Sequence, residues 1–125
     1  MIFLSYDEII TLHDKLISKT GGLCGLRDSA LLESAVFSIN ASFDEVEVYP
    51  SVEEKSARLA YSLINNHAFL DGNKRIGILA TLMTLTLNDI KITYTQQELV
   101  EVGLSVASGK FAYEAILNWI NSHKE

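Results

Sequence analysis

The longest uncharged segment of the chain, residues 76–88, reads I-G-I-L-A-T-L-M-T-L-T-L-N. It is shorter than the roughly 20 residues that a transmembrane helix needs, so we expect no membrane span. A helix that is apolar on every side has to be surrounded by protein. The sequence therefore predicts a helix that lies buried at the centre of the fold and ends at Leu87, where Asn88 and Asp89 break it.

Capping signals divide the rest of the chain into further helices. Three pairs have the S/T-x-x-E spacing of a capping box, in which each side chain accepts a hydrogen bond from the other residue's backbone N–H. They are Ser5 with Glu8, Ser51 with Glu54, and Thr95 with Glu98. Asp28 is suited to cap another helix, and apolar residues at helical spacing follow each start. These patterns predict an all-α bundle around a buried central helix, in a single domain covering residues 1–125.

Two short segments interrupt the helical pattern. Residues 41–50 alternate apolar and acidic side chains, which predicts an extended flap or a short hairpin. Tyr49 belongs either to a flap over a substrate or to ordinary side-chain packing. Residues 90–94 form a second, brief extended piece.

Composition excludes several classes of protein. The only cysteine, Cys24, cannot form an internal disulfide, which fits a reducing cytoplasm, and we expect its thiol to be buried or half-buried. The net charge is -6 and lysines and arginines are scattered, so we expect no direct nucleic-acid partner. The segment at residues 1–8 lacks the basic start of a signal peptide.

The residues at the start of the apolar helix are unusual for a core helix. Lys74 and Arg75 are cations at a helix N-terminus, where the helix dipole already places positive charge. This arrangement is favourable when an anion binds there. Gly72 allows close backbone approach, and the free N–H groups of the first turn are hydrogen-bond donors for phosphate.

Each residue of this start has a role that suits a phosphate site. Lys74 and Arg75 are expected to neutralise phosphate oxygens, and Asn73 to hydrogen-bond a phosphate or a hydroxyl. Asp71 offers the hard oxygen ligand that Mg²⁺ prefers.

A histidine precedes this start and supplies a base. With a pKa near neutrality in its unperturbed state, His67 can take a proton from an attacking hydroxyl. Phe69 is expected to anchor the loop in the core, whereas His13 and His123 are interpreted as structural. Together these residues predict transfer of a phosphorus-centred group to a hydroxyl.

The nine residues 67–75, H-A-F-L-D-G-N-K-R, resemble the motif of the Fic/Doc superfamily. Its Fic branch carries H-P-F-x-[DE]-G-N-G-R-x-x-R, and its Doc branch, the "death on curing" toxins, carries H-x-F-x-D-[AG]-N-K-R. Lys74 stands where Fic enzymes have glycine, and Ile78 where they have a second arginine. Residues 25–28 with 31–35, and 49–51 with 54–55, also resemble segments of Doc-type proteins, and helix order and length fit nearly the whole chain.

The resemblance implies a helical Fic fold and the toxin of a toxin–antitoxin pair. By that resemblance the protein is a kinase that transfers the γ-phosphoryl group of ATP to a threonine of translation elongation factor Tu and halts translation. His67 would be the base, Asp71 the Mg²⁺ ligand, and Gly72, Asn73, Lys74 and Arg75 the nucleotide-binding residues.

Regulation is also expected to follow the Doc branch. Many Fic enzymes carry an inhibitory [ST]-x-x-x-E-[GN] helix whose glutamate pairs with the second arginine. Residues 29–33 have that spacing, but Ser34 follows them, and Ile78 would offer the glutamate no partner. Inhibition is therefore expected from a separate antitoxin, whose disordered segment folds into a groove on binding.

Three other functions remain open on the sequence. AMP transfer to a protein is disfavoured by the bulk and charge of Lys74, and a catalytically silent interaction module by the intact motif. A metal hydrolase has only His67 and Asp71 as plausible ligands. The role of Arg27 is also open, between contact with the nucleotide or target and a structural pairing with an acid.

Overall fold

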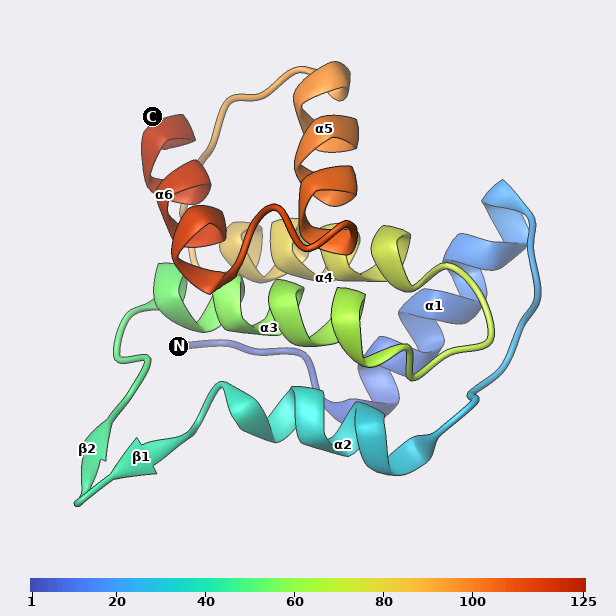
Figure 1. Cartoon of the computed structure of the whole chain (residues 1–125), viewed down its shortest axis with the longest axis horizontal. Coiled ribbons are helices and arrows are strands. Elements are labelled where there is room, and N and C mark those ends of the chain that lie inside the picture. Colours follow the sequence, from blue (N-terminus) through green and yellow to red (C-terminus); the bar gives the residue numbers. More distant parts are fainter.

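The protein consists of six helices and one small hairpin, in a computed structural model that describes residues 1–125 (Figure 1). The helices are α1 Tyr6–Thr20, α2 Ser29–Ser38, α3 Val52–Asn66, α4 Asn73–Leu87, α5 Gln96–Ala107 and α6 Tyr113–His123. The strands are β1 Ser42–Phe43 and β2 Val46–Glu47. The predicted all-α fold with a short hairpin is confirmed.

The capping residues work as their spacing predicts. All three predicted capping boxes form, with both hydrogen bonds present in each, and they start α1, α3 and α5. Asp28 starts α2 by accepting a hydrogen bond from the backbone N–H of Leu31 at 3.2 Å. Gly21 ends α1, and Asn88 follows the last residue of α4.

The centre of the fold is a pair of helices. Figure 1 shows α3 and α4 side by side and antiparallel. α4 packs against α1, α3 and α5, whereas α3 packs against α2, α4, α5 and α6, so the predicted central helix α4 shares its position with α3. The two approach closely at Gly77, where an added Cβ would lie 2.5 Å from Cγ1 of Ile64.

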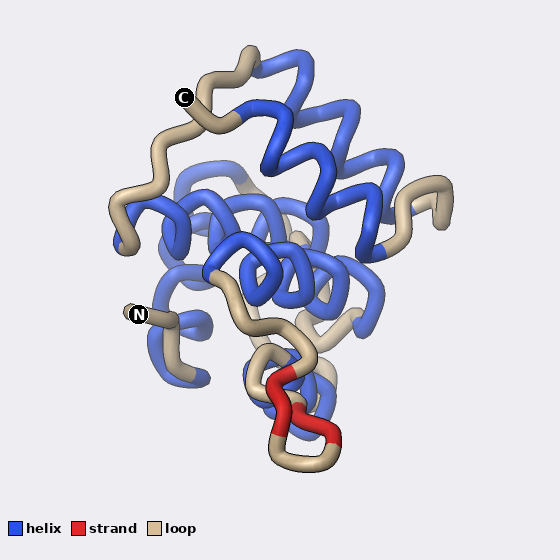
Figure 2. The backbone as a smooth tube through the Cα atoms, turned by 90° about the vertical axis from the view of Figure 1, so that its left-hand side faces the viewer, coloured by secondary structure: helices blue, strands red, loops and turns tan.

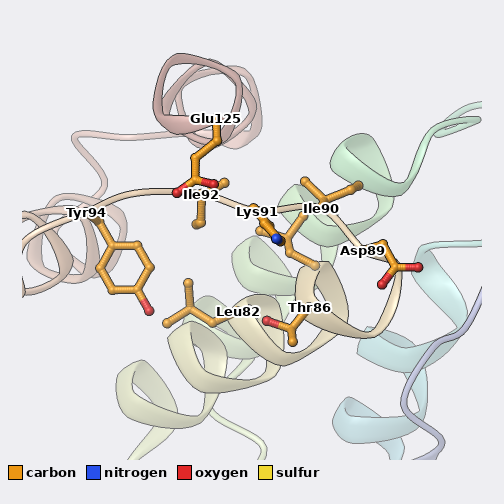
Figure 3. Close-up of a pocket in the computed structure, with 9 residues that line it drawn as sticks. Leu82, Thr86, Asp89, Ile90, Lys91, Ile92, Tyr94 and Glu125 are labelled. Atoms are coloured by element: carbon orange, nitrogen blue, oxygen red, sulfur yellow. The ribbon is translucent and has the colours of Figure 1, made fainter.

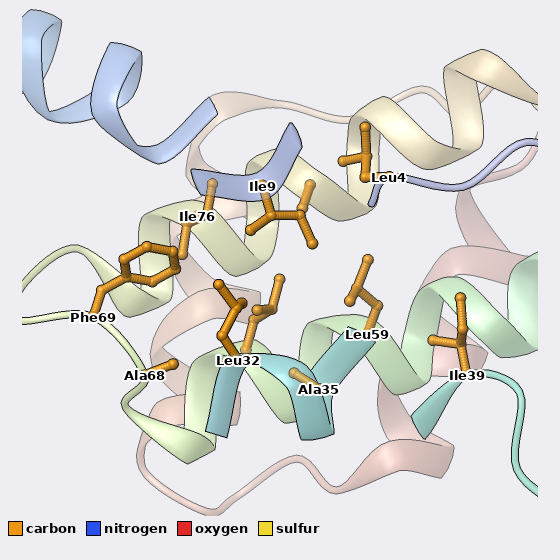
Figure 4. Close-up of a cluster of buried hydrophobic side chains, with 11 residues drawn as sticks. Leu4, Ile9, Leu32, Ala35, Ile39, Leu59, Ala68, Phe69 and Ile76 are labelled. Carbon is orange, nitrogen blue, oxygen red and sulfur yellow. The ribbon is translucent and has the colours of Figure 1, made fainter. Parts of the chain in front are cut away.

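The remaining helices cover this pair on opposite sides. α2 lies on one side, and α5 and α6 lie on the other, in both views (Figures 1 and 2). The buried side chains accordingly form two clusters. One joins α1 and α2 to the central pair and includes Ile9, Leu32, Phe69 and Ile76 (Figure 4), and the other joins α5 and α6 to it.

The hairpin stands at the far end of α3 from the motif. Val46 pairs with Phe43, and the buried Lys55 ties the hairpin down through its Nζ, which donates to Ile39 O and Glu47 Oε1 at 2.9 Å each. The hairpin precedes α3, whereas His67 follows it, and a 15-residue helix spans roughly 22 Å. The hairpin therefore is not a flap over the motif.

Tyr49 has the packing role. Its ring meets that of Tyr113 edge-on, with the ring centroids 5.0 Å apart, and the guanidinium of Arg58 lies 5.8 Å from it. Burial raises the pKa of Tyr113 to about 12. The packing interpretation of Tyr49 is confirmed, and the alternative of a flap over the substrate is wrong.

Two further expectations concern Cys24 and the membrane. The expectation of a buried thiol is wrong, because Cys24 is exposed in the segment that links α1 to α2. No helix of the protein combines the length and the apolar character that a membrane span requires.

Candidate active site

A six-residue loop, residues 67–72, joins the central helices and carries the first half of the motif. It begins at His67 and ends at Gly72, and both residues adopt left-handed backbone conformations, with φ of 53° and 73°. A non-glycine residue at positive φ is uncommon, so the surroundings have to hold His67 in this conformation.

The segment that precedes α2 holds this loop in place. Leu26 and Phe69 form an antiparallel β-bridge, and Ala68 O accepts hydrogen bonds from the N–H groups of Arg27 and Asp28 at 2.7 and 3.0 Å. Leu70 N donates to Gly25 O at 3.0 Å. Two segments about 40 residues apart in sequence thus form one structural unit.

Arg27 belongs to the same unit. Its Nε donates to His67 O at 2.7 Å and its Nη2 to Asn66 O at 3.3 Å, so it binds the carbonyl end of α3. A cation is favourable at a helix C-terminus, where carbonyl groups lack intrahelical partners. The pairing of Arg27 with an acid is therefore wrong, and its role is to end α3 just before the histidine.

Two motif residues fix the inner side of the loop. Phe69 is 2% exposed and points into the first core cluster (Figure 4), which confirms the predicted anchor. The side-chain amide of Asn73 brackets its backbone, accepting from Phe69 N at 3.0 Å and donating to Phe69 O at 3.1 Å. The phosphate contact predicted for Asn73 stays a prediction, and in this structure its amide closes the loop.

Asp71 lies at the start of α4, where no side chain caps the helix. Its carboxylate accepts from Gly72 N at 2.8 Å and from Leu23 N at 3.2 Å. These two N–H groups lower the pKa of Asp71, and the charge of Arg75 acts in the same direction. A carboxylate that stays ionised is the form that a cation binds.

The two cations at the start of α4 point to different neighbours. Arg75 lies towards α1, with Nη1 donating to Thr20 Oγ1 at 2.6 Å and to Gly21 O at 2.9 Å, and Nη2 3.6 Å from Asp71 Oδ1. The stem of Lys74 lies against α5, where an added Cβ on Gly103 would come within 3.2 Å of its Cγ. Lys74 is exposed, and its side chain makes no hydrogen bond.

His67 is exposed, and no hydrogen bond engages its imidazole ring. The structure thus brings Asp71, Gly72 and Arg75 into direct contact, with the Asn73 amide on the backbone of Phe69 in the same loop. His67 and Lys74 are free at the surface of the same loop and helix start. The exposed imidazole of His67 is accessible to another molecule.

One residue behind the site was interpreted only as structural. His13 of α1 is fully buried, stacks on Phe69 with 3.8 Å between the ring centroids, and hydrogen-bonds Asp71 O through Nε2 at 2.7 Å. The structural interpretation is correct, but the contact with the motif was missed. The signal was its place between Ile9 and Ile17 on the buried face of α1, because a buried polar ring needs a partner.

The residues of the site can supply one carboxylate to Mg²⁺, so water and phosphate oxygens would have to be its remaining ligands. No three His, Cys, Asp or Glu side chains gather into a metal site. Asp71 is half-buried and accepts two hydrogen bonds. Its two carboxylate oxygens therefore still have free lone pairs that could bind a cation. One or two carboxylates with water and phosphate oxygens is the usual environment of Mg²⁺.

A cavity of about 350 Å³ lies at the other end of α4 (Figure 3). Its lining includes Leu82, Asp89 and Tyr94, and none of the motif residues. Because α4 spans roughly 22 Å, this cavity is separate from the motif.

Comparison with known proteins gives consistent matches. The family model that matches residues 3–85 is described as the Fic/DOC family. The chain is 28% identical to the Protein kinase doc of Escherichia phage P1 over 116 residues, which cover 93% of this chain and 90% of that protein. It is 39% identical to the Toxin Doc of Mycolicibacterium smegmatis over 72 residues, which cover 58% of this chain and 55% of that protein.

Proposed function

This chain belongs to the Fic/DOC family, and from that premise we propose that it is a toxin that acts as a protein kinase. It transfers the γ-phosphoryl group of ATP to a threonine hydroxyl of translation elongation factor Tu, in the cytoplasm, and so halts translation. The two relatives, named Protein kinase doc and Toxin Doc, support the kinase and the toxin. The observation that carries the proposal is a helix start without a side-chain cap, with two cations and an ionised aspartate, beside an exposed histidine.

The residues of the chain divide the reaction among them. His67 takes the proton of the threonine hydroxyl, whose oxygen forms a bond to the γ-phosphorus. The bond from the γ-phosphorus to the β–γ bridging oxygen breaks, ADP leaves with that electron pair, and His67 releases its proton to solvent. Lys74, Arg75 and the first-turn N–H groups of α4 hold the phosphates.

Asp71 would hold Mg²⁺, which when bound neutralises charge on the phosphate oxygens. The backbone N–H groups of Leu23 and Gly72 keep the Asp71 carboxylate ionised and fix its direction. Asn73 keeps the loop closed around this carboxylate.

Two side chains favour phosphoryl transfer over AMP transfer. Lys74 places a long, charged side chain where Fic enzymes have glycine. Ile78, in the place of their second arginine, is half-buried and packs against the cluster shared with α5 and α6. The second arginine of Fic enzymes therefore has no equivalent in α4, where Arg75 is the only arginine.

The mass of the modified target tests the proposal. Purified protein is incubated with elongation factor Tu, ATP and Mg²⁺, and the product is weighed by mass spectrometry. A phosphoryl addition supports the proposal, whereas an adenylyl addition favours AMP transfer, and no addition at all contradicts this target.

A pair of variants tests the role of the base. His67→Ala is expected to lower the transfer rate by about 10²–10⁴-fold and to abolish growth inhibition. Leu70→Ala is the matched control, since Leu70 is 54% exposed in the same loop. Growth inhibition by His67→Ala at the level of the unmodified chain would favour the silent interaction module.

We also propose where the antitoxin binds. A groove of about 400 Å³ between α1, α4 and α5 adjoins Lys74 and Arg75, and its apolar lining includes Leu79, Leu99 and Val100. An amphipathic segment with an apolar face and acidic residues would fit this lining and these cations. Its binding would cover the phosphate site.

A charge in the groove tests this surface. Val100→Asp is expected to weaken antitoxin binding without changing the transfer rate. Val46→Asp is the control, because Val46 is also exposed but lies on the hairpin, away from the groove. Equal antitoxin affinity of the two variants, measured by calorimetry, would rule out the groove.

A further inference from the structure

The first helix, α1, contains none of the motif residues, yet its side chains contact three of them, Phe69, Asp71 and Arg75. We propose that His13 and Thr20 are positioning residues, which orient Asp71 and Arg75 for the nucleotide and its cation. The inference rests on the proposed function, in which Asp71 and Arg75 bind MgATP.

His13 fixes the turn that carries Asp71. A carbonyl oxygen only accepts hydrogen bonds, so Nε2 of His13 carries a hydrogen and donates to Asp71 O. The ring also stacks on Phe69, with an interplanar angle of 12°. The buried Nδ1 has no partner, so the only hydrogen bond of this fully buried ring is the one to the motif.

Thr20 fixes the direction of Arg75. Its hydroxyl donates to Leu16 O at 2.8 Å, and it therefore accepts from Nη1 of Arg75 in a defined direction. Gly21 O accepts a second hydrogen bond from the same nitrogen. Because Nη1 is held by both oxygens, Nη2 is directed towards Asp71, with its nitrogen 3.6 Å from Oδ1.

The two residues share one face of α1 with an apolar side chain between them. His13, Ile17 and Thr20 are spaced at i, i+4 and i+7, which places them in line along the helix. Ile17 and His13 enclose Gly72, where an added Cβ would lie 3.0 Å from Cδ1 of Ile17 and 3.5 Å from Nε2 of His13. The start of α4 therefore packs against this face of α1.

The link after α1 completes the contact. An added Cβ on Gly22 would lie 2.5 Å from Oδ2 of Asp71 and 3.1 Å from Nη2 of Arg75. The backbone can therefore approach Asp71 closely enough for Leu23 N to donate to it only with a glycine here. Without these supports, Arg75 would occupy several rotamers and bind phosphate less tightly.

Thr20 gives the sharper test, because it is exposed and its replacement leaves the core intact. Thr20→Val is expected to raise the Kd and the KM for MgATP by about three- to tenfold, with kcat changed less than about twofold. Thr20→Ser, which keeps the hydroxyl, is expected to restore the affinity of the unmodified chain.

Thr11 offers a matched control. It is exposed on α1, and its hydroxyl donates to Asp7 O, four residues earlier, as that of Thr20 does to Leu16 O. It contacts no motif residue, so Thr11→Val is expected to leave MgATP affinity unchanged. Equal affinities of Thr11→Val and Thr20→Val, measured by calorimetry, would overturn the role of Thr20.

His13 is tested by a pair of replacements of similar size. His13→Gln places an amide N–H at about the reach of Nε2, whereas His13→Leu fills the space without a donor. We expect the glutamine variant to keep MgATP affinity within about twofold and the leucine variant to lose about three- to tenfold. Equal loss in both folded variants would assign His13 a packing role only. If either variant fails to fold, the Thr20 series decides.

A spectroscopic measurement on the free protein separates this inference from the proposed function. A guanidinium held at Nη1 rotates slowly, so resolved Nη–H signals of Arg75 are expected by NMR in the unmodified chain and in Thr11→Val, and not in Thr20→Val. Signals that do not depend on Thr20 would overturn the inference, whatever the protein phosphorylates. Absence of phosphoryl transfer with Thr20-dependent signals would instead contradict the proposed function.

Discussion

The two central helices have the same length and lie side by side, yet they begin in opposite ways. α3 begins with a complete capping box, formed by Ser51 and Glu54, and with acidic residues in its first turn. α4 begins at Gly72 in a left-handed conformation, without a side-chain cap, and its first turn carries Lys74 and Arg75. The start of α3 matches the helix dipole, and the start of α4 opposes it.

The difference shows which of the two starts is organised for stability and which for a ligand. The Ser51 hydroxyl accepts from the backbone N–H of Glu54 in α3, whereas the N-cap residue of α4, Gly72, has no side chain to accept the equivalent bond. Hydrogen bonds to the end of α1 hold the guanidinium of Arg75, and the stem of Lys74 lies against α5 while its ammonium group is free. The cost of this start is therefore offset by tertiary contacts, and the start remains available to an anion.

The largest expected effect comes from reversing the charge at the start of α4. Lys74→Glu is expected to weaken MgATP binding by about 10–100-fold, because a charge-assisted contact to phosphate is lost and a repulsion added. The same change matches the helix dipole and is expected to stabilise the fold by about 0.3–1 kcal/mol. Lys110→Glu, an equal charge change in an exposed loop residue, is the control for calorimetry and thermal melts. If Lys74→Glu lowered both the stability and the MgATP affinity, the start of α4 would not be organised for a ligand at the expense of stability.

Next in size is the cost of a side chain at Gly72. Gly72→Ala is expected to destabilise the protein by about 1–2 kcal/mol, because φ is 73° and the methyl group would crowd Ile17. Transfer activity should fall as well. Gly109→Ala measures the cost of positive φ without any crowding, since φ is 83° and no atom lies within 4 Å of the added Cβ. Similar activity loss in both variants would exclude a local role for Gly72.

The corresponding experiment at the start of α3 removes its N-terminal cap. Ser51→Ala is expected to lower the free energy of unfolding by about 1 kcal/mol, as seen in urea titrations, and to leave MgATP affinity and transfer unchanged. Ser51→Thr keeps the cap and serves as the control. A change in nucleotide affinity would mean that the two helix starts are coupled.

The smallest expected effect is at the start of α5, where the capping-box acid also has a cation partner. Oε1 of Glu98 accepts from Thr95 N, and Oε2 pairs with His123 of α6. This pairing raises the pKa of His123 above 6.5, and its hydrogen bond lowers the pKa of Glu98 below 4.5. The histidine contribution is lost as pH rises through its raised pKa, and the glutamate contribution as pH falls through its lowered pKa.

The pair of Glu98 and His123 is therefore expected to stabilise the fold most at a pH between the lowered pKa of Glu98 and the raised pKa of His123. His123→Gln should lower the melting temperature more at about pH 5.5 than at about pH 9, in scans of both proteins. A pH-independent difference would show that the stacking of His123 on Trp119 accounts for its contribution.

Features set by neighbouring residues could be predicted from the sequence, and features set by distant contacts could not. The three capping boxes, the end of α1 at Gly21 and the hairpin depend on spacings of a few residues, and all are present. Phe69 was predicted to anchor the loop and is 2% exposed, whereas the neighbouring Leu70 is 54% exposed, so apolar character alone does not decide which side chain is buried. The place of the hairpin, far from His67, depends on the direction in which α3 runs and could not be derived locally.

The contacts around the motif show the same limit. The role of Arg27 was left open between contact with the nucleotide or target and a pairing with an acid. Its partners are carbonyl groups, which every residue carries and no sequence pattern reveals. Cys24 is exposed because the link between α1 and α2 follows the surface, which its own side chain does not determine. The contact of His13 with Asp71 joins residues 58 positions apart.

The distance in sequence between His13 and Asp71 determines how late in folding the motif takes its shape. The bonds that shape the loop at residues 67–72 reach back to residues 13–28, so α1 and the link to α2 must dock before the loop acquires its form. Contacts between segments distant in sequence carry the largest loop-closure entropy. We expect the motif to be among the last parts of the chain to become ordered, and a fragment beginning after residue 28 to be inert even with every motif residue present.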